Sequence, residues 1–154
     1  MFDKVLVVCV GNICRSPMAE ALLRARLGHR PRFDVSSAGV SALVGYPADE
    51  SAIALMRERG IDISAHRARQ LTPLLAAEAD LILVMESGHE RAVLDIAPQA
   101  RGKVHRIGRF GNFDVPDPYR LPRAAFLEAL SLCERAIADY ERAFWPPAVR
   151  KVHG

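Results

Sequence analysis

The chain has 154 residues, half of them hydrophobic and a quarter charged, with a formal net charge of +3. This length suits one domain with a sizeable core, so residues 1–154 are expected to form a single domain. No basic run is long enough to indicate nucleic-acid binding, and no apolar run approaches the ~20 residues that insert across a membrane. Three cysteines without a paired framework, and an N-terminus without a signal-peptide pattern, predict a cytoplasmic location.

The N-terminal stretch predicts a strand, a tight loop and a helix in direct succession. Val5–Val8 is a short apolar, β-branched run of the kind found in buried parallel strands. After the loop, Ser16 is a candidate N-cap, and apolar residues then recur at helical spacing up to a C-cap at Gly28. Within the loop, Gly11 is expected to supply backbone dihedral angles that a side chain would resist.

Strands and helices continue to alternate along the rest of the chain. The remaining strands are predicted at Phe33–Ser37, Leu81–Met85 and Val104–Ile107. Helices are predicted from an Asp49 cap to Gly60, from Thr72 to Ala77, at Ser87–Ile96 and at Arg123–Phe144. The alternation implies a three-layer α/β fold, in which helices cover both faces of a parallel sheet. A ligand site is then expected beyond the carboxyl ends of the strands.

The loop after the first strand carries the residues with the clearest chemistry. Cys9 opens it and Arg15 closes it six positions later, and between them lie Val10, Gly11, Asn12, Ile13 and Cys14. A loop that enters a helix turns backbone N–H groups and the positive helix end toward one point. These donors suit a phosphate, which an arginine can hold through two parallel hydrogen bonds. They also favour a thiolate, so Cys9 is a candidate nucleophile toward phosphorus.

The motif Cys-x5-Arg-Ser, here VCVGNICRSP, resembles that of the low-molecular-weight protein tyrosine phosphatases, and the resemblance extends from about Lys4 to Trp145. It implies a sheet of four parallel strands with a phosphate-binding loop, residues 10–16, after strand 1. It also implies that phosphotyrosine is hydrolysed through a phosphocysteine on Cys9, with inorganic phosphate as the product. Arg15 would bind the phosphate oxygens and the charge that develops in the transition state.

A second motif, VPDPY at residues 115–119, supplies a carboxylic acid between two prolines that stiffen the backbone. A phenolate leaves faster when it is protonated, which is worth about 10²–10⁴ in rate. The resemblance assigns this general acid, and the later activation of water, to Asp117. Asp114 lacks the Pro-Tyr context. Tyr119 is expected to form an aromatic wall for the substrate ring, although packing against the prolines is the alternative.

Further residues are expected to support the loop. The segments VSSAG and ISAHRARQ resemble family segments whose Ser and His hydrogen-bond the loop asparagine, which assigns this support to Ser37, His66 and Asn12. The resemblance also gives Ser16 a second role, donation of its hydroxyl to the Cys9 sulfur. The other histidines show no metal-ligand spacing, so neither a metal nor another cofactor is expected; they are His29, His89, His105 and His153.

The two cysteines besides Cys9 have different expected roles. In the resembled family, a cysteine placed like Cys14 can form a reversible disulfide with the nucleophile and so prevent its overoxidation. A buried small side chain is the alternative for Cys14. Cys133 lies on the apolar stripe of the last predicted helix, which favours core packing.

The rim of the predicted site indicates a subgroup. Many relatives have an aromatic residue where Leu43 stands in the segment Ser41–Gly45. The aliphatic residue, followed by GYPAD and later by DPYR, resembles the bacterial subgroup that dephosphorylates tyrosine autokinases of exopolysaccharide export. The implied partner is a phosphotyrosine protein, in particular a membrane tyrosine autokinase.

Three other activities are compatible with parts of this pattern. A thiol-dependent arsenate reductase would need further relay cysteines in a flexible segment, and only Cys133 lies beyond the loop. Protein-arginine phosphatases of similar sequence carry Thr after the loop asparagine, whereas Ile13 here favours a phosphotyrosine ester. A binding module without catalysis is expected to lack Cys9 or Asp117, and both are present.

Overall fold

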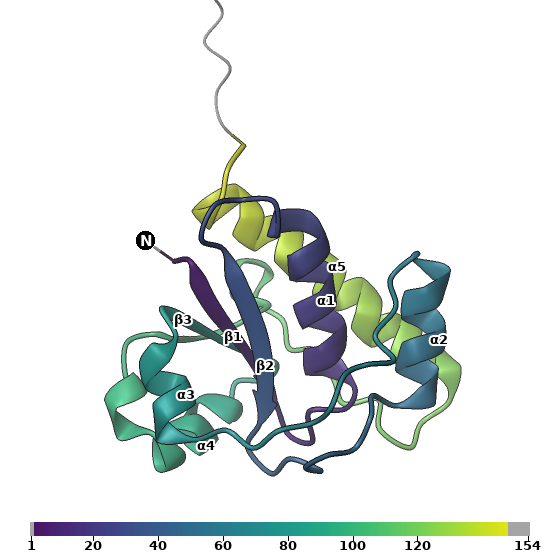
Figure 1. The fold of residues 1–154 in the computed structure, drawn as a ribbon, viewed down its shortest axis with the longest axis horizontal. Helices are drawn as coiled ribbons and strands as arrows, with labels where there is room; N and C mark the ends of the chain where they lie inside the picture. The colour runs from purple at the N-terminus through teal and green to yellow at the C-terminus, as the bar shows by residue number, and fades with distance from the viewer. Residues whose placement is uncertain (1, 148–154) are drawn as a thin grey trace, which may run out of the picture.

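The structure, a computed structural model, describes residues 2–147. At its centre is one parallel sheet in the order β2-β1-β3-β4 (Figure 1), which confirms the predicted four-stranded parallel sheet. The strands are Lys4–Cys9 (β1), Asp34–Gly39 (β2), Leu81–Val84 (β3) and Val104–Arg106 (β4). β2 runs further than predicted because it pairs with β1 along its whole length, as far as Cys9 opposite Gly39.

Helices cover both faces of the sheet, as Figure 1 shows, and this confirms the three-layer prediction. One layer contains α1 (Arg15–Leu27), α2 (Glu50–Glu58) and α5 (Arg123–Phe144). The other contains α3 (Pro73–Glu78), α4 (His89–Ile96) and the 3₁₀ turn η1 (Pro98–Ala100). A second 3₁₀ turn, η2 (Arg109–Gly111), lies in the long connection between β4 and α5.

Successive residues of β1 belong to two different cores, one on each side of the sheet. Val5, Val7 and Cys9 pack with the layer of α1, α2 and α5, while Leu6 and Val8 pack with the layer of α3 and α4. A strand that is buried on both faces reads as a continuous apolar run because neither set of side chains meets water. Cys9 is the last residue of this strand, so the burial of β1 on both faces fixes the position at which the following loop begins.

Side-chain caps begin two of the helices where the sequence predicts them. The Asp49 carboxylate accepts a hydrogen bond from the Ser51 N–H at 2.9 Å, and the Thr72 hydroxyl accepts one from the Leu75 N–H at 3.2 Å. Both bonds satisfy a backbone donor that has no partner within its helix. The helix predicted from Ser87 begins instead at His89, because residues 86–88 form a turn closed by the His89 N–H on the Glu86 carbonyl.

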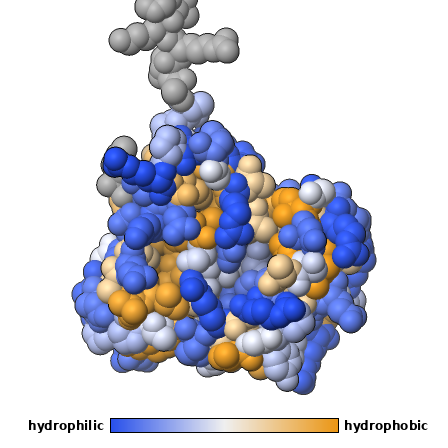
Figure 2. Space-filling view, viewed as in Figure 1, coloured by the Kyte–Doolittle hydropathy of each residue, from blue (hydrophilic) through white to orange (hydrophobic). Residues whose placement is uncertain are grey.

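The face shown in Figure 2 is mainly hydrophilic, with separate hydrophobic patches. Within residues 2–147, none of the helices is long and apolar enough to cross a bilayer. The buried apolar residues form the two cores, one on each side of the sheet.

Candidate active site

The loop between β1 and α1 turns its carbonyl groups outward. The backbone N–H groups of Val40, Ser41, Leu43 and Asp49 donate to the carbonyls of Cys9, Val10, Gly11 and Ile13, at 2.8–3.1 Å. Across a trans peptide the N–H points away from the carbonyl, so the N–H groups of these peptide units face the inside of the loop. A ring of inward N–H groups at the start of a helix is an anion-binding concavity.

The unusual backbone angle of this loop is at Asn12 and not at Gly11. Asn12 has a φ of 60°, whereas Gly11 is absent from the positive-φ residues of the described chain, so the expectation for Gly11 was wrong. A Cβ on Gly11 would meet only ordinary contacts, at 3.7 Å from Ile13 and 3.9 Å from Leu43. Asparagine tolerates the left-handed region better than most residues, and here its side chain is fixed by hydrogen bonds.

Asn12 is fully buried and connects the loop to three other segments. Its amide nitrogen donates to the hydroxyls of Ser16 at 2.7 Å and Ser37 at 2.9 Å, and its amide oxygen accepts from the Arg69 N–H at 2.9 Å. Its backbone carbonyl lies 2.7 Å from Nε2 of His66. Because a carbonyl only accepts, this contact assigns the imidazole proton to Nε2.

Ser16 lies against the sulfur of Cys9 at the bottom of the loop. The distance between Ser16 Oγ and Cys9 Sγ is 2.9 Å. Because this hydroxyl accepts from Asn12, its own proton is free for the sulfur. The prediction of Ser16 as the N-cap was wrong: α1 begins at Arg15, with Cys14 in the cap position and no side-chain cap bond. The hydroxyl is engaged within the loop instead.

Arg15 is the largest fully buried side chain of the described chain. Its Nη1 donates to Oε1 of Glu86 at 2.7 Å and to the carbonyl of Val115 at 2.8 Å. Its Nη2 lies 3.7 Å from Oδ2 of Asp117, which is an ion-pair contact rather than a hydrogen bond. Both protons of Nη1 are thus engaged, and the Nε and Nη2 edge of the guanidinium is left for a ligand.

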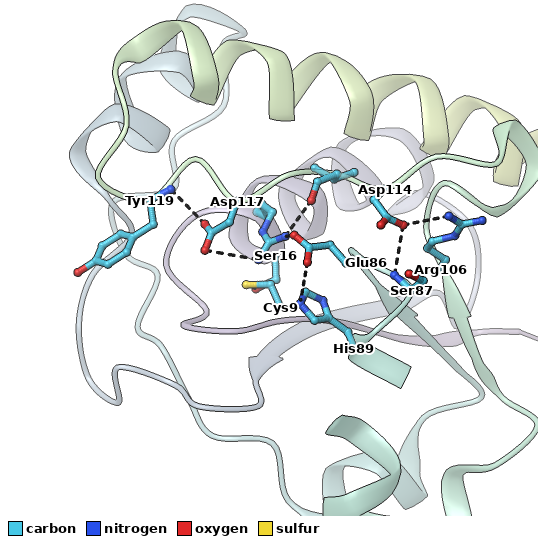
Figure 3. Close-up of polar contacts among 11 residues, drawn as sticks. Cys9, Ser16, Glu86, Ser87, His89, Arg106, Asp114, Asp117 and Tyr119 are labelled. Carbon is cyan, nitrogen blue, oxygen red and sulfur yellow. Dashed lines mark hydrogen bonds and ion pairs between the residues drawn. The ribbon is translucent and has the colours of Figure 1, made fainter. Parts of the chain in front are cut away.

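Two aspartates follow β4, and Figure 3 shows them on either side of Glu86. Asp117 is exposed, accepts a hydrogen bond from the Tyr119 N–H at 3.0 Å and lies on the Cys9 side. Asp114 accepts from Nη1 of Arg106 at 2.9 Å and from the Ser87 N–H at 3.2 Å. Of the two, only Asp117 lines the same pocket as Cys9.

Cys9, Arg15 and Asp117 line one pocket of about 290 Å³, together with the predicted rim residues Leu43 and Tyr119. Tyr119 is 39% exposed, so its ring is available to a ligand. Ser37 and His66 are outside the lining and contact Asn12 from behind. The structure thus brings the predicted site residues together as a lining and a support.

Cys14 also lines the pocket, while Cys133 lies in the core on α5. Burial raises the pKa of the Cys14 thiol far above its usual value, and the Asp49 carboxylate adds to this rise. Burial likewise raises the pKa of Cys133 to about 12. Both side chains are therefore thiols at neutral pH, and all three cysteines are free.

Several residues of the site were not predicted from the sequence. Glu86 binds Arg15, Glu20 accepts a hydrogen bond from the Ser37 hydroxyl at 2.6 Å, and the Arg69 guanidinium donates to the Ser37 carbonyl at 2.8 Å. Arg120 stacks over the Tyr119 ring at 5.2 Å and lines the pocket. Arg120 belongs to the DPYR motif; no sequence pattern marks Glu86, Glu20 or Arg69, because each acts through a contact with a residue that is distant in sequence.

No group of three or more His, Cys, Asp or Glu residues within 2–147 is arranged to hold a metal ion. His29 and His105 lie outside the pocket lining, and His153 falls outside the described residues. His89 contacts Glu86, with 3.6 Å between Nε2 and Oε2.

Known proteins are similar to this chain in sequence and in fold. A model of the low molecular weight phosphotyrosine protein phosphatase family matches residues 4–144. The probable low molecular weight protein-tyrosine-phosphatase EpsP of Ralstonia nicotianae is 49% identical over 150 residues, which cover 97% of this chain and 98% of that protein. The low molecular weight protein-tyrosine-phosphatase Wzb of Escherichia coli K12 is 44% identical over 144 residues, 93% of this chain and 96% of Wzb.

Solved structures agree with these matches. Wzb of Vibrio vulnificus in complex with benzylphosphonate superimposes with a TM-score of 0.88 at 44% identity, covering 93% of this chain and 99% of that one. The family match covers residues 4–144, which include the loop and the VPDPY segment, and the structural match covers 93% of the chain. The chain therefore belongs to the low molecular weight phosphotyrosine protein phosphatase family, which confirms the predicted resemblance and the enzyme class, a protein-tyrosine phosphatase.

Proposed function

We propose that Cys9, Arg15 and Asp117 carry out phosphotyrosine hydrolysis through a phosphocysteine. The observation that carries this proposal is that all three side chains line one pocket, with the sulfur at its base. The loop N–H groups and the free edge of Arg15 would bind the three phosphoryl oxygens. Cys9 would then lie in line with the phosphorus–oxygen bond to the tyrosine.

The first step transfers the phosphoryl group to sulfur. Cys9 attacks phosphorus, the bond to the phenolic oxygen breaks, and the protonated form of Asp117 gives its proton to that oxygen. Asp117 is exposed and lines the pocket, so its carboxyl group is accessible to the phenolic oxygen of a bound substrate. The carboxylate that results is then placed to act as a base.

The second step releases inorganic phosphate. The Asp117 carboxylate takes a proton from a water molecule, whose oxygen attacks the phosphocysteine while the phosphorus–sulfur bond breaks. The Ser16 hydroxyl, 2.9 Å from the sulfur, would stabilise the departing thiolate by a hydrogen bond. Asn12, Ser37 and His66 would keep the loop in the shape that both steps require.

The substrate proposed is a phosphotyrosine protein, with Leu43 and Tyr119 as the walls around the ring. Benzylphosphonate, present in the Vibrio vulnificus Wzb structure, combines an aromatic ring with a phosphonate, as the head of phosphotyrosine combines a ring with a phosphate. The subgroup resemblance, together with the matches to EpsP and Wzb, supports a membrane tyrosine autokinase of exopolysaccharide export as the partner. The free thiols support a reducing, cytoplasmic location, and we propose the whole chain as one phosphatase domain.

The test of the nucleophile is Cys9→Ser, assayed on p-nitrophenyl phosphate and on a phosphotyrosine peptide. We expect turnover at the background rate, because a serine hydroxyl has no base beside it here to activate it. The control is Cys133→Ala, which removes a buried thiol outside the pocket. Rapid acid quenching of wild type should trap a phosphate on Cys9; a folded Cys9→Ser variant with substantial turnover would contradict the proposal.

The partner proposal needs a separate measurement. The phosphorylated cytoplasmic domain of a tyrosine autokinase from the same organism is compared with an unrelated phosphotyrosine protein at equal phosphotyrosine concentration. We expect a higher kcat/KM for the autokinase. Equal values for both substrates would leave the phosphatase activity intact and exclude the autokinase preference.

A further inference from the structure

The orientation of Arg15 depends on a carboxylate that belongs to neither of the two motifs. Glu86 follows β3 and Met85, and its Oε1 accepts from Arg15 Nη1 at 2.7 Å. The Arg15 side chain is only 2% exposed, so it needs a charge partner before any phosphate arrives. Since a guanidinium is planar, fixing Nη1 on Glu86 and on the Val115 carbonyl fixes the direction of the remaining Nε and Nη2 edge.

The second oxygen of Glu86 faces His89, the first residue of α4. His89 Nε2 lies 3.6 Å from Glu86 Oε2, and Figure 3 shows the imidazole below the carboxylate, on the side away from Asp114. The torsion that rotates a carboxylate is broad, so one contact on one oxygen does not fix it. A contact on each oxygen restricts that rotation, and through it the position of Arg15.

His89 is in an environment that a purely structural histidine would avoid. Its ring is largely buried, and its Nδ1 is the one buried side-chain nitrogen or oxygen within residues 2–147 without a hydrogen-bond partner. Leaving a buried polar atom without a partner costs free energy. With the proton on Nε2, the N–H points to the carboxylate and only a lone pair is left unpaired. The other tautomer would bury an unpaired N–H and turn a lone pair toward Glu86.

The charges around His89 keep it neutral. Burial lowers its pKa, and the Arg15 guanidinium acts in the same direction, while the carboxylates of Glu86, Asp114 and Asp117 oppose them. The net direction is downward from a usual value that is already below neutral pH. At pH 7 His89 is therefore neutral: it contacts Glu86 through Nε2 and does not compete with Arg15 as a second cation.

We propose that Glu86 and His89 are a positioning pair: His89 orients the Glu86 carboxylate, and Glu86 holds Arg15 with its free edge turned toward the phosphoryl group. This inference rests on the proposed role of Arg15 in binding that group. Neither residue lines the pocket. A misplacement of a binding group by about 1 Å costs on the order of 10²-fold in rate, so positioning residues have measurable effects.

Four variants and two readouts test this pair. Glu86→Ala should lower kcat/KM for p-nitrophenyl phosphate by about 10²-fold and weaken inhibition by inorganic phosphate. Glu86→Gln keeps an oxygen for Arg15 Nη1 and should restore most of both values. His89→Leu should cost less, about tenfold, and His89→Gln, which carries an N–H near the position of Nε2, should recover part of that loss.

The matched control is Asp114→Asn. Asp114 also pairs with an arginine and lies next to Ser87, but its partner is Arg106 and not Arg15. It should keep kcat/KM and the phosphate inhibition constant within about twofold of wild type. Thermal unfolding of each variant distinguishes loss of the fold from displacement of the Arg15 guanidinium. If Glu86→Ala does not fold, the two His89 variants and Glu86→Gln provide the test.

Two outcomes distinguish failure of this inference from failure of the proposed mechanism. If Cys9→Ser is inactive while folded Glu86→Ala and His89→Leu match wild type in kcat/KM and in phosphate inhibition, the positioning pair is excluded and the mechanism stands. If Cys9→Ser keeps its turnover, the mechanism fails and the positioning pair fails with it.

Discussion

Side chains at the base of the pocket are buried and make several hydrogen bonds each, whereas those on its rim are exposed and make few. Asn12, Arg15 and Ser16 are at most 1% exposed, and each contacts at least two partners. The Asp117 side chain is 46% exposed and accepts one hydrogen bond, from the Tyr119 N–H. The difference supports our proposal that the base sets the geometry of the phosphoryl group, while the rim can vary with the substrate.

Asp117 is the expected exception to this comparison, because we propose a catalytic role for its side chain although it lies on the exposed rim. Asp117→Asn removes the proton for the leaving group, so kcat should fall by about 10²–10⁴ on a poor leaving group such as phenyl phosphate. The loss should be smaller on p-nitrophenyl phosphate, whose phenolate needs less help. Phosphate inhibition should persist, and near-wild-type turnover on phenyl phosphate would contradict the acid role.

Asn12→Ala tests the rigidity of the base. It removes three side-chain hydrogen bonds of a buried residue and leaves a non-glycine residue at a φ of 60°. We expect the free energy of unfolding to fall by about 3 kcal/mol and kcat/KM by about 10²-fold. Chemical denaturation and steady-state kinetics provide the two measurements.

The control for this variant is Asn112→Ala. Asn112 has a φ of 54° and accepts a hydrogen bond from Arg106 at 2.7 Å, but it is exposed and outside the pocket. The free energy of unfolding of the Asn112→Ala variant should be about 1 kcal/mol lower than that of wild type, and its kcat/KM should be unchanged. Similar losses of activity in both variants would show that the effect comes from the left-handed backbone and not from the loop network.

Cys14 allows a further test of the base of the pocket. It lines the pocket, but burial raises the pKa of its thiol and keeps the thiol protonated. We propose that peroxide converts the Cys9 thiolate to a sulfenic acid, which then condenses with the Cys14 thiol to a disulfide and releases water. Dithiothreitol should restore wild type after peroxide, and Cys14→Ser should recover to a lesser extent after the same exposure. Equal recovery of both proteins would favour the packing role for Cys14.

The smallest effect is expected on the rim. Tyr119→Leu removes an aromatic contact worth about 0.5–1.5 kcal/mol, so KM for a phosphotyrosine peptide should rise roughly 2- to 13-fold. Inhibition by inorganic phosphate, which has no ring, should not change. If phosphate binding weakens as much as peptide binding, Tyr119 supports the base and is not a wall of the pocket.

Prediction from the sequence was most accurate where neighbours in sequence are neighbours in space. The strand, loop and helix at residues 4–27 form one continuous unit, and the capping residues Asp49 and Thr72 act within a few positions of themselves. Two predictions about the loop after β1 were wrong. Ser16 was expected to cap α1 and Gly11 to take the unusual backbone angle, but the loop network uses the Ser16 hydroxyl and places that angle at Asn12.

The sequence by itself determined the family, the parallel α/β sheet and the presence of a phosphate-binding loop, because these depend on apolar periodicity and on one short motif. Only the tertiary structure decided how Arg15 is held. Its partners Glu86 and Val115 lie 71 and 100 positions away in sequence. Glu86 comes close to Arg15 because β3, which precedes Glu86, pairs with β1 in the sheet. Val115 comes close because its N–H donates to the carbonyl of Met85, the residue before Glu86. Contacts between distant segments depend on how the elements pack, and no local pattern of residues records them.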